Sequence, residues 1–208
     1  MKNCYTALPK GYVKVGEADS TGGTKYGRWL NVFSILIMIV AVYIIYSLRF
    51  GTSEDNVSLV GFWASRIHLL FFLFVFVVSL LCHSLLHGVM YRFMTGQDFK
   101  ISAGGNLVCC SLPGVYMKRK AAVTALLAPF VLFSVIFIIA MSCTQGYLAL
   151  AFVFAFAIHT GCCAGDFYIV FQLLFKYKGD VLMHEGGMKQ AFYIYSAKAA
   201  EAQEEDEE

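Results

Sequence analysis

Charged residues are scarce in this chain of 208 residues. They make up 14% of it, whereas about 25% is usual for a soluble domain. The scarcity is concentrated in three stretches without any Asp, Glu, Lys or Arg: between Arg28 and Arg49, between Arg66 and Arg92, and over residues 121–165. A helix needs about 20 apolar residues to cross a bilayer core, and the third stretch is long enough for two crossings. These absences exclude a water-soluble globular protein.

We therefore predict an all-α membrane protein with four transmembrane helices. The predicted spans lie near residues 29–49, 67–91, 121–141 and 147–174. They form a membrane domain over 29–175, with an N-terminal arm (1–28) before it and a tail (176–208) after it. The first span is not a cleaved signal peptide, because its apolar core is too long and about 28 polar, glycine-rich residues precede it.

Two segments outside the spans have a distinct composition. The loop over 92–120 contains "SAGGNLVCCSLPGVYM", which is glycine-rich and moderately apolar, and we expect it to form a hairpin-like structure at the cytoplasmic interface. The tail ends in "EAQEEDEE", a run of acids typical of a solvated, disordered terminus.

Basic residues are distributed unevenly on the two sides of the predicted membrane domain. Of the sixteen Lys and Arg residues, all but Arg49 and Arg66 fall in the N-terminal arm, the 92–120 loop or the tail. Lys and Arg accumulate on the cytoplasmic side of membrane proteins, so both termini of this membrane protein are expected in the cytoplasm. The net charge of +2 is not that of a nucleic-acid binder. Membrane lipid is the expected surrounding.

Seven cysteines are present, but we expect no disulfide framework, because only Cys143 lies near the predicted outer face.

Ionisable side chains inside a membrane are costly and usually functional. His83 and His87 are four residues apart and share one helix face, which lets one helix offer two nitrogen ligands to a metal ion. At about 1.5 Å per residue, Asp166 on the last span lies level with His83, whereas His159 lies roughly 10 Å further outward. The pattern predicts a zinc site made by two histidines and a carboxylate, with Cys162 or water in the fourth position.

At these residues the chain resembles the putative zincin peptidase family of small bacterial membrane proteins. That family is similar in layout to the site-2-type intramembrane metalloproteases. The stretches that carry the resemblance are "CHSLLHG" (82–88), "LPGVYMKRKAAVTALLAPF" (112–130) and "GCCAGDFYIV" (161–170). The resemblance implies one zinc ion per chain, held by His83, His87 and Asp166, and a transmembrane or loop peptide as substrate.

One departure from the family pattern concerns catalysis. Zincins carry glutamate after the first histidine, and that glutamate is the general base. Here the position is Ser84, whose hydroxyl has no pKa suited to the task. His159 could replace the base only if it lies closer than its sequence position suggests. We therefore expect a metalloprotease-like protein with lost or weakened proteolysis, a pseudoenzyme.

Two other functions remain open from the sequence. The polar stripe of histidines and Asp166 could line an ion path in a small transporter, or fix helix packing in a scaffold. Two histidines from facing helices could also bind a b-type haem, although the depth mismatch between His159 and His83 argues against it.

Overall fold

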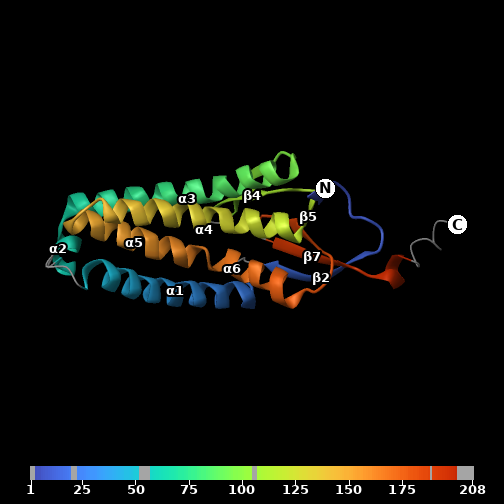
Figure 1. The fold of residues 1–208 in the computed structure, drawn as a ribbon, viewed down its shortest axis with the longest axis horizontal. Coiled ribbons are helices and arrows are strands. Elements are labelled where there is room, and N and C mark those ends of the chain that lie inside the picture. The colour runs from blue at the N-terminus through green and yellow to red at the C-terminus, as the bar shows by residue number, and fades with distance from the viewer. Residues whose placement is uncertain (1–2, 20–22, 52–56, 105–106, 188, 201–208) are drawn as a thin grey trace. The chain divides into compact units, whose positions relative to one another are not determined.

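The computed structural model describes residues 3–19, 23–51, 57–104, 107–187 and 189–200 (Figure 1). The chain divides into two compact units, each made of segments distant in the sequence. Unit 1 comprises Met1–Arg28, Ser84–Ala128 and Asp166–Glu208, and unit 2 comprises Trp29–His83 and Pro129–Gly165. The acidic run at 201–208 lies outside the described residues, so its expected disorder stays a prediction.

Helices make up most of the described chain. They are α1 (Lys25–Phe50), α2 (Leu59–Ala64), α3 (Arg66–Thr95), α4 (Arg119–Ser142), α5 (Gly146–Cys162), α6 (Ala164–Phe171) and the π-helical segment η1 (Gln172–Lys176). Four helical stretches are long and apolar enough to cross a membrane, which confirms the four predicted spans: α1, α3, α4 and the continuous run from α5 to η1. Large apolar side chains such as Leu48, 79% exposed, lie on their surface, as expected where lipid is the solvent.

Unit 2 is a helical bundle. In Figure 1 its parts of α1, α3, α4 and α5 run alongside one another. Its core is aromatic and aliphatic, with Phe62, Leu150 and Val153 fully buried. At one end of the bundle, Arg49 donates hydrogen bonds to the carbonyls of Met141 (3.0 Å) and Thr144 (2.8 Å), which satisfies backbone groups near the end of α4.

A close approach joins α1 and α5 inside unit 2. The hydroxyl of Ser34 donates to the carbonyl of Gly161 at 2.7 Å. A Cβ atom at Gly161 would lie only 2.9 Å from the carbonyl oxygen of Ser34 and 3.0 Å from Cβ of Met38. Glycine is therefore needed here for close packing, as is common between membrane helices.

Unit 1 contains an antiparallel sheet in addition to helix ends. The strands are β1 (Cys4–Tyr5), β2 (Tyr12–Asp19), β3 (Lys100–Gly104), β4 (Leu107–Ser111), β5 (Tyr116–Lys118), β6 (Val181–Glu185) and β7 (Lys189–Tyr195). Five of them form one sheet in the order β1-β5-β6-β7-β2, and β3 pairs only with β4 among the described strands. The core beneath the sheet includes Leu112, Met117, Leu173, Met183 and Phe192, none of them measurably exposed.

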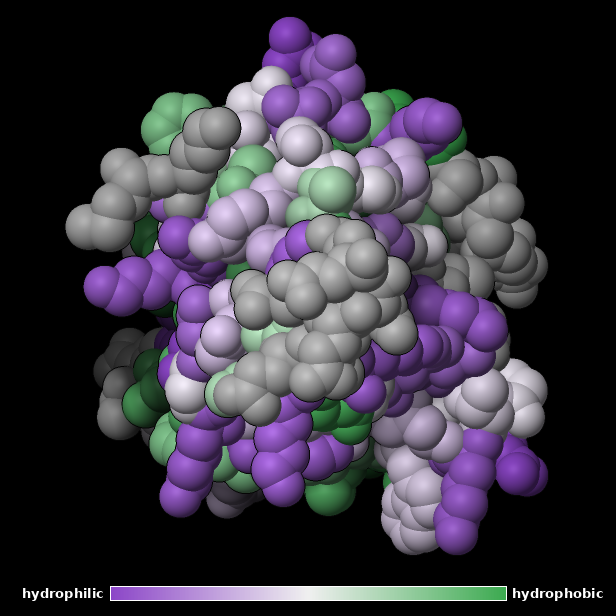
Figure 2. Space-filling model, turned by 90° about the vertical axis from the view of Figure 1, so that its right-hand side faces the viewer, coloured by the Kyte–Doolittle hydropathy of each residue, from purple (hydrophilic) through white to green (hydrophobic). Residues whose placement is uncertain are grey.

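The predicted all-α class is therefore incomplete. The segments 1–28 and 176–208, expected as an arm and a tail, supply β2, β6 and β7, and β2 pairs with β7 from Tyr12–Tyr195 to Asp19–Lys189. These strands are short and lack one clean alternation of buried and exposed residues, so their period-2 signal is weak. The face at the strand-bearing end of unit 1 is largely hydrophilic (Figure 2), in contrast to the apolar helix surfaces.

Candidate metal centre

His87 and Asp166 lie together inside unit 1. The Nε2 atom of His87 is 3.5 Å from Oδ2 of Asp166, and both side chains are largely buried, with exposed fractions of 12% and 17%. His87 projects from α3, and Asp166 lies in the first turn of α6. The structure thus brings together two of the three ligands that the sequence predicts.

The other ring nitrogen of His87 is held by the backbone. Nδ1 lies 3.1 Å from the carbonyl oxygen of Ala125 on α4. A carbonyl only accepts hydrogen bonds, so Nδ1 carries a proton, and in the neutral ring Nε2, the nitrogen beside Asp166, then keeps its lone pair. Metal-binding histidines usually have this arrangement, with the distal N–H donated to a carbonyl or carboxylate. The ligands of a tetrahedral zinc ion lie roughly 3.3 Å apart, so the pair fits zinc in both spacing and chemistry.

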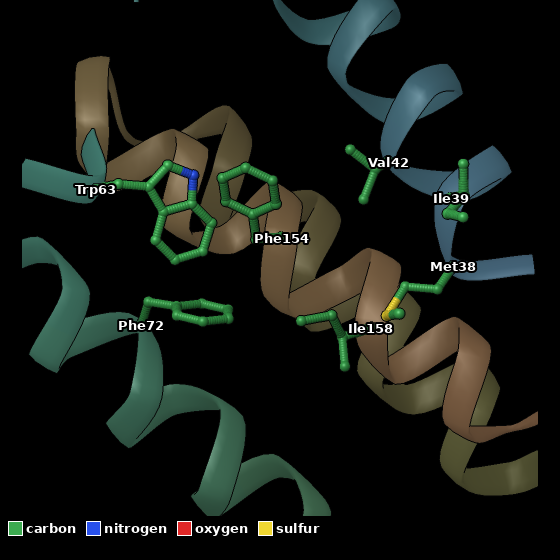
Figure 3. A pocket seen from close by; sticks show the side chains of 7 residues that line it. All are labelled: Met38, Ile39, Val42, Trp63, Phe72, Phe154 and Ile158. Carbon is green, nitrogen blue, oxygen red and sulfur yellow. The ribbon is translucent and has the colours of Figure 1, made fainter. Parts of the chain in front are cut away.

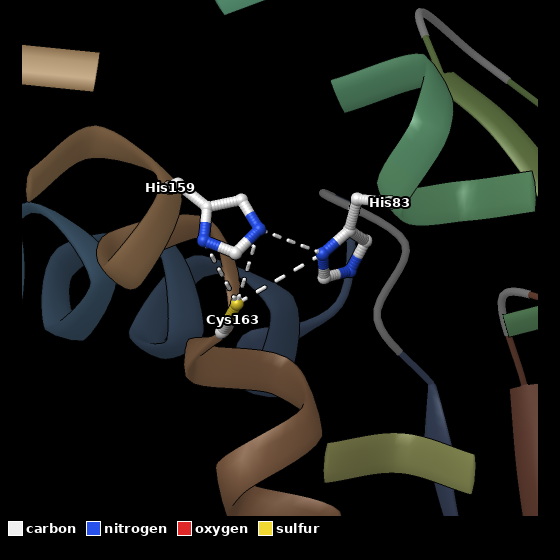
Figure 4. A group of neighbouring side chains, drawn as sticks. All are labelled: His83, His159 and Cys163. Carbon is white, nitrogen blue, oxygen red and sulfur yellow. Dashed lines mark hydrogen bonds between the residues drawn. The ribbon is translucent and has the colours of Figure 1, made fainter. Parts of the chain in front are cut away.

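His83 lies on the same unbroken helix α3, four residues before His87, and therefore on the same helix face. Within unit 2 its Nδ1 is 3.2 Å from Nε2 of His159 and 3.9 Å from Sγ of Cys163 (Figure 4). As in His87, it is thus the Nδ1 atom that contacts a neighbouring group.

The depth expected for His159 was wrong. His159 was expected roughly 10 Å further outward than His83 and Asp166, but the His159 and His83 rings are in contact, with centroids 5.2 Å apart. One reason is that depth was counted from the expected end of each span. The helix α3 ends at Thr95 and not near residue 91, so His83 lies about 6 Å further from that end than expected.

Helix spacing explains which of the two adjacent cysteines faces the histidines. Cys162, the predicted fourth ligand, is exposed, whereas Cys163 is fully buried beside His83 and His159. Cys163 follows His159 by four residues and therefore lies on the same helix face, a spacing that is visible in the sequence.

Ser84, half-buried on α3, follows His83 as the sequence requires. A second buried carboxylate in unit 1, Glu185 on β6, was missed by sequence reasoning because it lies outside the predicted spans. Its oxygens accept hydrogen bonds from Tyr91 Oη (3.2 Å), the amide of Gly187 (2.9 Å) and the side chain of Gln190 (2.9 Å). These contacts hold Glu185 at the end of β6, close to the candidate site: Glu185 interacts electrostatically with His87, and the ring of Tyr91 stacks on that of His87 with centroids 6.0 Å apart.

Unit 2 also contains an apolar cavity of about 260 Å³ (Figure 3). Its lining residues are Met38, Ile39, Val42, Trp63, Phe72, Phe154 and Ile158. The lining has almost no polar surface, so it offers neither metal ligands nor acid–base groups.

Comparison of the chain with known proteins gave a match to a family model. No curated protein and no solved structure matches the chain. A family described as putative zincin peptidase matches residues 75–181, slightly more than half of the sequence. The matched region includes both histidines of α3, the Ala125 carbonyl that orients His87, and Asp166. The chain belongs to the putative zincin peptidase family.

Proposed function

We propose that this protein is a membrane-embedded relative of the zinc peptidases that binds one zinc ion through His83, His87 and Asp166 and has lost most of its hydrolytic activity. The observation that carries the proposal is the His87–Asp166 pair, 3.5 Å apart, with the remaining nitrogen of His87 anchored on the Ala125 carbonyl. The two groups are within ion-pair distance, and the same two atoms can also bind one zinc ion. The family match supports the same chemistry.

His83 completes the proposed ligand set from the same helix face. Its Nδ1 contacts His159, and we assign its Nε2 to zinc, as in His87. When bound, zinc supplies a Lewis acid that lowers the pKa of bound water. The protein would supply the three ligands, and the Ala125 carbonyl keeps a proton on Nδ1 of His87. The match to a zincin family gives no support to the alternative of a transporter or scaffold.

Ser84 is the basis for proposing impaired catalysis. In zincins a glutamate at this position takes a proton from water, and such assistance typically contributes roughly 10²–10⁴-fold to the rate. A serine hydroxyl cannot take that proton near neutral pH. His159 contacts His83 through its Nε2, so we place it behind a ligand and not as the base. A peptide segment of a membrane protein or a loop is the proposed binding partner.

Restoring the glutamate tests this proposal. We expect no measurable cleavage of unfolded casein or of a transmembrane reporter by the purified wild type, and zinc-dependent cleavage by Ser84→Glu. Ser84→Gln, which matches glutamate in size but cannot accept the proton, is the control and should stay inactive. Brisk, chelator-sensitive cleavage by the wild type would overturn the impaired-enzyme proposal.

A further inference from the structure

A second group of metal-ligating side chains lies entirely within unit 2. It consists of His83 from α3, His159 from α5 and Cys163 directly after α5 (Figure 4). His83 Nδ1 is 3.2 Å from His159 Nε2, and the Sγ atom of Cys163 is 3.9 Å and 4.0 Å from these two nitrogens. Two nitrogen atoms and one sulfur atom thus form a small triangle.

The size of this triangle suits a metal ion at its centre. A point equidistant from the three donor atoms lies about 2.2 Å from each, and metal bonds to histidine nitrogen and cysteine sulfur are about 2.0–2.3 Å long. An N–H···N hydrogen bond explains the 3.2 Å contact between the rings, whereas the thiol lies at the outer limit of hydrogen-bond distance from both nitrogens, a separation that a shared metal ion would also give.

The surroundings favour an ion of low charge. His159 is 1% exposed and Cys163 is fully buried. The ring of His159 lies 4.8 Å from that of Phe133 and 5.9 Å from that of Phe137, centroid to centroid. Uncompensated charge in such apolar surroundings is costly. A monovalent cation bound to one thiolate leaves no net charge, whereas a divalent cation leaves one.

We propose that His83 Nδ1, His159 Nε2 and Cys163 Sγ form a second metal site, selective for a soft monovalent ion, Cu⁺. Thiolate ligands select Cu⁺ over the divalent ions that a carboxylate site prefers. The proposal uses Nδ1 of His83, whereas Nε2 is assigned to zinc; a ring that binds both ions is an imidazolate, which has also released its N–H proton to solvent. Binding breaks the S–H bond of Cys163, Sγ forms a bond to copper, and the proton leaves to solvent. No change of oxidation state is involved.

The adjacent cysteine provides a matched control. We would titrate the detergent-purified full chain with Cu⁺ under anaerobic conditions, against a chromogenic Cu⁺ chelator strong enough to remove copper from isolated thiols. The wild type and Cys162→Ser should each retain one equivalent, and Cys163→Ser should lose it. Retention of copper by Cys163→Ser, loss by Cys162→Ser, or no retained copper in the wild type would overturn the proposal.

Two further measurements separate this site from the zinc site and from misfolding. Asp166→Asn should lose zinc yet keep its equivalent of Cu⁺, and loss of both metals would contradict a separate site. X-ray absorption at the copper edge of the wild type, which needs no variant, should show one sulfur and two nitrogen neighbours at roughly 2.0–2.3 Å. A first shell without sulfur, or with several sulfurs, would contradict the assignment.

Discussion

The buried environment of Glu185 could not be predicted from the sequence. Burial raises the pKa of its carboxyl group from 4.5 to about 7, although hydrogen bonds from Gln190 and Gly187 favour the charged form. Between these two pH values the folded protein holds a proton that the unfolded chain has released. The stabilisation that this proton gives is fully present below pH 4.5 and falls as the pH rises to about 7, by roughly 3 kcal/mol.

We therefore expect Glu185→Gln to remove this part of the pH dependence, since an amide does not titrate. Thermal unfolding in detergent between pH 5 and 8 should show a wild-type midpoint that drops towards pH 7 more steeply than that of the variant. Glu17→Gln is the control, because Glu17 forms a surface ion pair with Lys14, and such pairs contribute little. Equal slopes for the wild type and Glu185→Gln would contradict a buried, protonated carboxyl group.

The residues of the candidate site were only partly predictable. His83, His87 and Asp166 follow from i, i+4 spacing and the scarcity of ionisable groups, and the structure brings His87 and Asp166 together. The contact of His83 with His159 was missed because depth was counted from assumed helix ends, and α3 ends later than expected. The choice of Cys163 over Cys162 follows from the i, i+4 spacing of His159 and Cys163, which the sequence contains.

At the scale of elements, the packing of α1 against α5 depends on Gly161. Alanine there places Cβ 2.9 Å from the backbone oxygen of Ser34, which cannot move aside as a flexible side chain would. We expect Gly161→Ala to destabilise the protein by roughly 1–3 kcal/mol, the usual cost of overpacking, despite the better helix propensity of alanine.

Gly165→Ala is the matched control for this prediction. Its new Cβ would meet only Cδ2 of Leu30, at an ordinary 3.6 Å. Thermal unfolding in detergent should show a lowered midpoint for Gly161→Ala and little change for Gly165→Ala. A neutral or stabilising effect at Gly161 would show that α1 and α5 do not pack this closely.

The sequence predicts the long helices much better than it predicts the strands. Long charge-free runs predict the four helical spans, because nothing else in a protein requires about 20 consecutive apolar residues. The strands β6 and β7, of five and seven residues, carry no comparable signal and lie in a segment whose end is acidic. Their pairing with β2, from the opposite end of the chain, is a long-range contact that local patterns do not encode.

For the whole molecule, the uneven distribution of Lys and Arg leads us to propose that both termini face the cytoplasm. A fluorescent reporter that matures only in the cytoplasm should be active at the C-terminus, and alkaline phosphatase, which requires an oxidising compartment, should be inactive there. Alkaline phosphatase activity at the C-terminus would reverse the orientation. Fusions within the loop between Arg49 and Arg66 should give the opposite pattern and serve as the control.

The central claim is that α3 and α6 together hold zinc. The most direct measurement is the zinc content of detergent-purified protein after dialysis against a weak chelator, for the wild type and for His83→Ala, His87→Ala and Asp166→Asn. His184→Ala is the control, since His184 lies on β6, where its Nε2 accepts a hydrogen bond from the Gly114 amide. We predict about one zinc per chain in the wild type and in His184→Ala, and little in the other three variants, because two remaining ligands hold zinc poorly. A wild type without zinc, or a His87→Ala variant that retains it, would contradict the account.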